Sequence, residues 1–365
     1  MHEELSGVWI MAYTTIDDPS VYFQALLYTG DGNASQAQTN TGNSDLQPDW
    51  IWIKKRNSAR NTTNTDSSRG FNKRLETQTN SAETTTTNDV ISAQSDGFTV
   101  GDNGSTGNNS DTYVAWQWKA NGGTTSTNSS GSSNSTVQAN TTAGFSIVKR
   151  TGTGSAGATY GHGLGAVPDV IINKGLNSNE WYSYFKAIGG GTHWIDLSGT
   201  GAKVDDANMW NDTDATSTLF TVGNSGGSNG SSVEYIAYCF TSIQGYSKFG
   251  SYTANNSTDG PFVYLGFKPA WIMVKNTSAA ADWPITDNKR EAGNPFGEEM
   301  LFANGNDAET NYTGGGIDFL SNGFKIRSSG TNGVHNANNT SHTFIYMAFA
   351  ESPFVSSEGV PTTAR

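Results

Sequence analysis

Three short stretches of the chain share one pattern: a proline, a run of bulky apolar and β-branched residues, and a lysine. They read PDWIWIK at residues 48–54, PDVIINK at 168–174 and PAWIMVK at 269–275. Each run is too short for a helix and too apolar for a strand with one wet face, so it predicts a strand covered on both faces. The proline suits the first residue of such a strand, because it cannot donate to the ladder.

Two further landmarks follow each proline run in the same order. One is a strand built on a phenylalanine, at residues 96–101, 218–223 and 322–326, and the other is an aromatic strand, at 112–118, 234–240 and 343–349. The spacing of roughly 100–120 residues is that of a whole β-sandwich domain rather than a solenoid repeat. The sequence therefore predicts an all-β protein of three tandem antiparallel β-sandwich-like repeats.

The same landmarks divide the chain. The predicted parts are a short N-terminal helical or extended segment at 1–27, repeats at 28–119, 143–245 and 246–354, a linker at 120–142 and a tail at 355–365. Asp18 and Pro19 have the order of a helix start, and about two helical turns are expected after them. The linker is almost pure Gly, Ser, Thr and Asn, a composition typical of flexible segments. Repeats one and two are thus expected to be separable, whereas repeats two and three, joined by a short connector, are expected to touch.

Large aromatic and apolar side chains are the expected core. The predicted core residues are Trp50, Trp52, Phe98, Trp116, Trp118, Ile171, Phe220, Tyr238, Phe240, Trp271, Phe324 and Phe349. In the three closing aromatic strands, alternation places uniformly large side chains on one face, and this face is assigned to the sandwich interior. The other face mixes aromatic and small residues, so a neighbour could approach it closely.

Charge and cysteine content narrow the possible partners. The net charge of −12 argues against binding to nucleic acid or to an anionic membrane surface, since both depend on Lys and Arg. No apolar run is long enough to span a membrane, and no secretory leader is recognisable. The single cysteine, Cys239, is expected to be a small buried hydrophobe, which suits a protein made in a cytoplasm.

Much of the positive charge falls in one polar stretch. Residues 54–95 contain Arg56, Arg60, Arg69, Lys73 and Arg74. A solvated face is the simpler interpretation of this stretch. Contact with an acidic neighbouring subunit is the alternative.

The sequence offers little chemistry. None of its five histidines has metal-ligand spacing on a predicted helix, and no catalytic constellation is found, so neither an enzyme nor a cofactor is predicted. Trp181 and Trp283 are candidate sugar-stacking residues, although a tryptophan at a strand start also suits a core. The turns at 31–33 and 102–104 carry Asp and Asn, which can ligate Ca²⁺ or simply form turns.

Several longer strings are distinctive: MAYTTIDDPS at 11–20, YVAWQWK at 113–119, HGLG at 162–165, YIAYCF at 235–240, KFGSYT at 248–253 and GVPTTAR at 359–365. These strings resemble a repeat protein of marine bacteriophages (cyanophage or pelagiphage type), a family of tail-fibre-like virion structural proteins. The resemblance covers nearly the whole chain from Met11. It implies a virion component, and it carries no catalytic motif.

The hypothesis is therefore a non-enzymatic virion structural protein, made in the host cytoplasm and displayed on a tail fibre, other appendage or capsid surface. Its expected partners are other copies of itself and other virion proteins, with neither nucleic acid nor membrane among them. The alternative is a lectin-like receptor-binding module that recognises host surface glycans through Trp181 and Trp283. A polysaccharide depolymerase and a cellular surface-layer or filament protein remain further alternatives.

Overall fold

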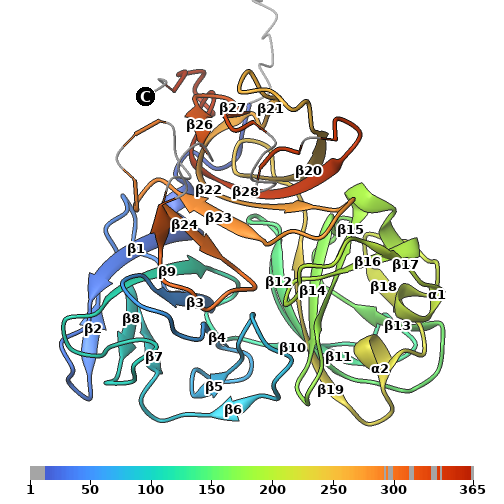
Figure 1. Ribbon diagram of the computed structural model, residues 1–365. Coiled ribbons are helices and arrows are strands. Elements are labelled where there is room, and N and C mark those ends of the chain that lie inside the picture. Colours follow the sequence, from blue (N-terminus) through green and yellow to red (C-terminus); the bar gives the residue numbers. More distant parts are fainter. Residues whose placement is uncertain are drawn as a thin grey trace, which may run out of the picture.

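Three antiparallel sheets carry the fold (Figure 1). The computed structural model describes residues 13–291, 293–294, 299–311, 316–329, 335–337 and 339–362. The first sheet has the order β1 (Phe23–Thr29), β9 (Thr112–Trp118), β3 (Trp50–Lys55) and β4 (Thr63–Asp66). The second has the order β10 (Ser126–Asn128), β11 (Ser135–Asn140), β12 (Phe145–Thr151), β19 (Glu234–Phe240), β14 (Val170–Gly175), β15 (Trp181–Phe185), β16 (His193–Asp196) and β17 (Val204–Asp205). The third has the order β20 (Ser247–Thr253), β28 (Thr343–Pro353), β22 (Phe267–Asn276), β23 (Pro284–Asp287), β24 (Glu299–Phe302) and β25 (Thr310–Asn311).

Each of these sheets is covered on its outer face by a smaller layer. The layer on the first sheet is β2 (Gln36–Gln38), β8 (Gly97–Val100) and β7 (Val90–Gln94). The layer on the second is β13 (Ala158–Gly161) and β18 (Leu219–Val222), with α1 (Ala207–Trp210) and α2 (Gly226–Asn229) beside it. The layer on the third is β21 (Phe262–Tyr264), β27 (Gly323–Ile326) and β26 (Ile317–Leu320). A ribbon of β5 (Lys73–Arg74) and β6 (Thr84–Thr85) and the 3-10 turns η1 (Pro19–Val21), η2 (Lys186–Ile188) and η3 (Gly190–Thr192) complete the described elements.

We call each large sheet with its small layer a unit, numbered 1 to 3 along the chain. In every unit the proline-led strand (β3, β14 or β22) pairs with the aromatic closing strand (β9, β19 or β28), which pairs on its other side with a third strand (β1, β12 or β20). All of these pairs are antiparallel. The all-β class is confirmed. The three units share one strand order, whereas their superposition as tandem repeats stays a prediction.

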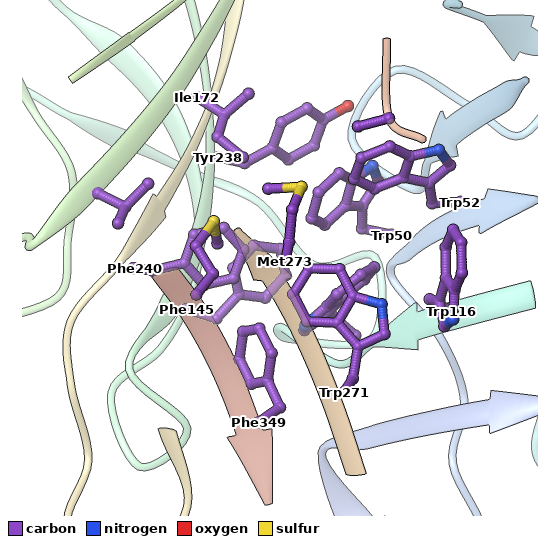
Figure 2. Packing of buried hydrophobic residues seen from close by; sticks show 14 of the residues in the cluster. Trp50, Trp52, Trp116, Phe145, Ile172, Tyr238, Phe240, Trp271, Met273 and Phe349 are labelled. Carbon is purple, nitrogen blue, oxygen red and sulfur yellow. The ribbon is translucent and has the colours of Figure 1, made fainter. Parts of the chain in front are cut away.

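The three large sheets face one another around a single aromatic core (Figures 1 and 2). Trp50 of unit 1 stacks on Tyr238 of unit 2 with ring centroids 4.3 Å apart. Phe349 of unit 3 lies 5.8 Å from Phe240 of unit 2 and 5.7 Å from Trp118 of unit 1. The expectation that units 1 and 2 are separable is therefore wrong: the uniformly large faces are the surfaces through which all three units join.

The mixed faces of the closing strands form the sandwich interiors. In unit 1, Tyr113 and Ala115 pack with Phe98 and Val100 of the small layer. The corresponding faces of β19 and β28 pack on their own small layers. The assignment of the two faces from the sequence was thus inverted, because alternation separates the faces but does not say which neighbour each one meets.

The residues predicted as core are all buried. The exposed fraction is at most 1% for Trp50, Trp52, Phe98, Trp116, Trp118, Ile171, Phe220, Tyr238, Phe240, Trp271, Phe324 and Phe349. Their prediction is confirmed. At about 25 cal/mol per Å² of apolar surface, the aromatic side chains dominate the hydrophobic stabilisation of this polar chain.

The predicted flexible linker is instead ordered secondary structure. Its residues form β10 and β11, which extend the second sheet beyond β12. The buried carboxylate of Asp49 holds the entry to this hairpin, since it accepts bonds from the backbone N–H groups of Ala120 (2.7 Å), Gly122 (2.9 Å) and Gly123 (2.8 Å). The composition indicated a flexible segment, but hydrogen bonds from its backbone to the Asp49 carboxylate of unit 1 hold the start of this segment in place.

The N-terminal segment contains the predicted helix start but not the predicted helix. Asp18 accepts a bond from the backbone of Ser20 at 3.0 Å, and Pro19 opens the 3-10 turn η1, which ends at Val21. The chain then enters β1, whose Phe23 packs 5.1 Å from Trp118. The boundary expected after residue 27 therefore cuts a strand of the first sheet, because tertiary packing of alternating apolar residues outweighs a local helix signal.

The cationic stretch at 54–95 is largely paired rather than solvated. Arg69 is 1% exposed and binds Asp66 and Glu83, and Arg74 binds Asp89. Arg56 reaches across to Glu309 of unit 3 at 2.6 Å. The solvated-face interpretation is wrong for these residues, and the acidic neighbour of Arg56 belongs to the same chain.

Two of the three units place a buried ion pair at the edge of the shared core. In unit 1, Asp66 lies 2.5 Å from Arg69, and the hydroxyl of Tyr238 from unit 2 donates to Asp66 at 2.8 Å. In unit 3, the Asp287–Arg290 pair is 2.6 Å long. The indole N–H of Trp116 from unit 1 donates to Asp287 at 3.1 Å.

Unit 2 has no ion pair at the matching positions. Phe185 pairs with Val170 as Asp66 pairs with Trp50 and as Asp287 pairs with Trp271. Ile188 follows three residues later, and both side chains belong to the shared core. The same pair of positions in the fold can therefore hold either a buried ion pair or two apolar side chains.

We expect Arg69→Ile to lower the free energy of unfolding by about 3–5 kcal/mol, because it leaves a buried carboxylate without its cation. The triple variant Asp66→Phe, Arg69→Ile, Tyr238→Phe imitates unit 2 and keeps the ring stacked on Trp50. It should recover more than half of the loss, measured by urea denaturation. If the triple variant is no more stable than Arg69→Ile, the apolar pair of unit 2 cannot replace the ion pair of unit 1.

The lysine next to the last residue of each proline-led strand is buried in all three units. Lys54 of unit 1 donates to the carbonyl of Gly305 in unit 3 at 2.5 Å. Lys275 of unit 3 donates to the carbonyl of Thr200 in unit 2 at 2.7 Å, whereas Lys174 bonds within its own unit. Burial lowers the pKa of Lys54 to about 7 and those of Lys174 and Lys275 to about 8.

Because the pKa values of these lysines are lowered, we expect the free energy of unfolding to rise with pH above neutrality. Between the folded pKa of Lys54, about 7, and its ordinary value of 10.5, the unfolded chain binds one more proton than the folded chain. Stability therefore increases with pH in this window, by on the order of 1 kcal/mol per pH unit for one lysine. Urea midpoints at pH 7, 8 and 9 should rise, and Lys54→Met should flatten the slope. Exposed Lys186→Met is the control, and an equally steep slope in Lys54→Met would contradict the assignment.

Candidate binding cleft

The two tryptophans proposed to stack on sugar are both buried. Trp181 is 0% exposed and Trp283 is 1% exposed. The indole N–H of Trp181 donates to the carbonyl of Glu76 in unit 1, and that of Trp283 to the carbonyl of Asp196 in unit 2, both at 2.9 Å. A ligand cannot reach either ring, so their assignment as binding residues is wrong. Each locks its unit to the preceding one.

The junction between units 1 and 3 uses a smaller side chain for the same purpose. Thr77 of unit 1 donates its hydroxyl hydrogen to the carbonyl of Ala303 in unit 3 at 2.7 Å. Every unit thus reaches into a neighbour, and the three contacts close a ring around the shared core.

Two further side chains able to do chemistry, Cys239 and His162, are also enclosed. Cys239 is fully buried as predicted, and burial raises the pKa of its thiol to about 12. His162 is buried with one ring nitrogen 3.1 Å from the carbonyl oxygen of Thr216, and burial lowers the pKa of its imidazole. Neither group is presented to a substrate.

The acidic turns are held by local bonds. Asp31 accepts from the backbone N–H of Asn33 at 2.9 Å, and Asp102 accepts from the side chain of Asn88 at 2.7 Å. Within the residues that the structure describes, no group of three or more His, Cys, Asp or Glu gathers as a metal site. The local turn interpretation is sufficient for these contacts.

The strands β1, β12 and β20 each lie beside an adjoining unit, and the three junctions formed there differ. At the first junction, β12 is covered by β11. Beside β20, the connector bonds the strand through Ser242 and Ile243, and a hollow of about 180 Å³ remains. Beside β1 lies an open cleft of about 470 Å³ between units 1 and 3.

The cleft has two walls of different origin. The wall from unit 1 comprises Asp18, Ser20, Phe23, Gln24, Ala25, Thr41, Gly42 and Asn43. The wall from unit 3 comprises Ala270, Asn288, Lys289, Arg290, Glu291, Ala350 and Glu351. Arg290 is already bound to Asp287, and Asn288 donates to Glu351 at 2.8 Å. Among the described atoms, the side-chain oxygen of Asn288 is buried with no hydrogen-bond partner.

Sequence reasoning missed this cleft, although one signal was visible. The residue after the proline is Asp49 in unit 1 and Asp169 in unit 2, but Ala270 in unit 3. Both aspartates fix the chain that crosses their junction. Asp49 accepts from the backbone of Ala120, Gly122 and Gly123, and Asp169 accepts from the backbone of Ser242 at 2.8 Å. Alanine at the third position provides no such anchor, and this junction contains the open cleft.

A second exposed feature is a pair of aromatic rings on the small layer of unit 3. Phe262 and Tyr264 of β21 are each 47% exposed, and Val263 between them is buried. The ammonium of Lys248 lies 5.4 Å from the centre of the Tyr264 ring. Both rings therefore project from the same outer face of a strand.

Comparison with known proteins gives one match. The model of a family described as DUF7483, a domain of unknown function, matches residues 18–353. The chain belongs to this family. No curated protein and no solved structure matches it. Among the described residues, none of the helices has the length and apolar character required to cross a membrane.

Proposed function

We propose that this protein is a non-enzymatic structural component of a bacteriophage particle, displayed on a tail fibre, other appendage or capsid surface. The observation that carries the proposal is the use made of its reactive and aromatic side chains. Trp181, Trp283 and Lys275 bond across unit boundaries, and Cys239 and His162 are enclosed within unit 2. The side chains that suggested chemistry serve the fold.

The architecture supports a role in rigid display. One aromatic core is shared by all three units, so no unit can leave without exposing large rings to water. Lys54, Lys275 and the donors Tyr238 and Trp116 fix the orientation of the units, since each would lose an acceptor in the adjoining unit if that unit moved. The resemblance of the chain to marine bacteriophage proteins agrees with this role.

The role can be tested on particles of the phage that carries this gene. Antibodies raised against the purified chain should label intact, density-purified virions in electron micrographs, at a regular position on the tail or capsid. Virions that lack an antigen present in the infected-cell lysate would contradict the proposal. So would hydrolysis of a polysaccharide by the purified chain.

Glycan recognition is the second candidate, and Phe262 and Tyr264 favour it over the buried tryptophans. Exposed aromatic rings offer apolar faces on which a sugar ring can stack, and Lys248 adds a donor beside them. If a glycan array gives a specific signal, the double variant Phe262→Ala, Tyr264→Ala should reduce it at least about tenfold, or about 1.4 kcal/mol. The exposed Val204→Ala is the control. Uniform background on the array would remove this candidate.

A further inference from the structure

The outer edge of β1 presents unpaired backbone groups to the cleft. The bonds from Lys119 N–H to Tyr22 and from Gly30 N–H to Asp111 set the alternation along β1. Even-numbered residues bond to β9, so the N–H and C=O groups of Phe23, Ala25 and Leu27 point to the outer edge. In the part of the chain that the structure describes, no strand pairs with this edge.

Unit 2 shows how such an edge can be completed. Phe145, Ile147 and Lys149 of β12 hold the positions of Phe23, Ala25 and Leu27, because both sets pair with their closing strands in the same register. Here β11 lies antiparallel along the edge, opposing Ile147 with Gln138. The chain itself therefore contains a strand bound to this kind of edge.

The side chain of Gln138 reaches the adjoining unit. Its amide nitrogen donates to the hydroxyls of Ser67 and Ser68 at 2.9 Å each, and its oxygen accepts from the backbone of Asn121 and Gly123. Gln138 is completely buried. An amide side chain thus fills the junction between units 2 and 1.

The open cleft offers matching groups. Asp287 corresponds to Asp66 in register, so Asn288 and Lys289 take the places of Ser67 and Ser68. The Asn288 side-chain oxygen is a buried acceptor without a partner among the described atoms, and Lys289 is an exposed cation. A glutamine or asparagine can donate to the first and accept from the second.

We propose that the cleft between units 1 and 3 receives an extended segment of a partner protein, which adds to β1 as an antiparallel strand. The chemistry expected of this segment is that of β11: small polar residues around one Gln or Asn that points into the cleft. Backbone bonds to Phe23, Ala25 and Leu27 would supply the affinity and the amide contact the selectivity. The inference does not depend on the virion role, because an edge strand can capture a peptide in any setting.

The probe is a fluorescein-labelled peptide with the sequence of residues 132–142, SSNSTVQANTT, titrated with the full chain. We expect saturable binding in fluorescence polarisation. On binding, hydrogen exchange should slow at the amides of Ala25 and Leu27, whereas Gln24 and Leu26, already bonded to β9, should change little. A peptide with proline in place of Gln138 should bind at least about tenfold more weakly, since it loses a ladder donor.

Ala25→Pro is the decisive protein variant. It removes an outward N–H without breaking a bond to β9, and edge strands tolerate proline. It should weaken peptide binding at least about tenfold while the urea midpoint stays near that of the parent. Ser251→Pro, at an outward position of β20, is the matched control and should bind the peptide as the parent does.

Three results would overturn the proposal. The first is absence of peptide binding up to about 1 mM, an affinity weaker than about 4 kcal/mol. The second is equal binding by Ala25→Pro and the parent. The third is slow exchange at Ala25 and Leu27 in the free chain, which would show the edge to be occupied already. Deleting residues 1–12, or diluting the chain, then tells whether its own N-terminal segment or a second copy is the occupant.

Discussion

The packing of three aromatic sheet faces against one another is the constraint on which the rest of this structure depends. Trp50, Tyr238 and Phe349 come from three different units and meet in one dry core (Figure 2). A chain so rich in Gly, Ser, Thr and Asn has few other apolar groups with which to offset the conformational entropy of ordering. Sharing one core among three sheets lets each large ring serve two units at once, which three separate sandwiches would not allow.

This arrangement buries polar groups where the units meet, and the chain pairs several of them across the boundaries, although the indole N–H groups of Trp50, Trp52, Trp118 and Trp271 have no partner among the described atoms. Backbone carbonyls of one unit accept from Trp181, Trp283, Lys54 and Lys275 of the next. An unpaired donor in such a place would cost on the order of 1–3 kcal/mol. The relative orientation of the units is therefore set by hydrogen bonds, and the hydrophobic core holds them together.

Within a common frame, equivalent positions carry different chemistry. Tyr28 of unit 1 stacks on Tyr113, and Tyr252 of unit 3 stacks on Phe344, each with ring centroids 5.2 Å apart. At the matching place in unit 2, the guanidinium of Arg150 lies 4.5 Å from the centre of the Tyr235 ring. A flat cation thus replaces a flat ring. The same freedom explains why Ala270 can stand where the other units have aspartate, and why one junction is open while another is filled by a strand.

The sequence alone determined the all-β class and the three landmark strands of each unit, which are the proline-led, the phenylalanine and the closing aromatic strand. Periodicity, proline positions and aromatic runs indicated an all-β chain and the burial of the twelve predicted core residues. This was possible because the local pattern shows which large apolar side chains a strand must bury. Trp50 and Tyr238 could be predicted as buried, but not as partners of each other. Only the tertiary structure decided which face met which neighbour, that residues 120–142 are strands rather than a linker, and that Trp181 is inaccessible. The physical reason is that these outcomes depend on bonds between residues far apart in the chain, such as Asp49 to Gly123, and a local pattern carries no information about a distant partner.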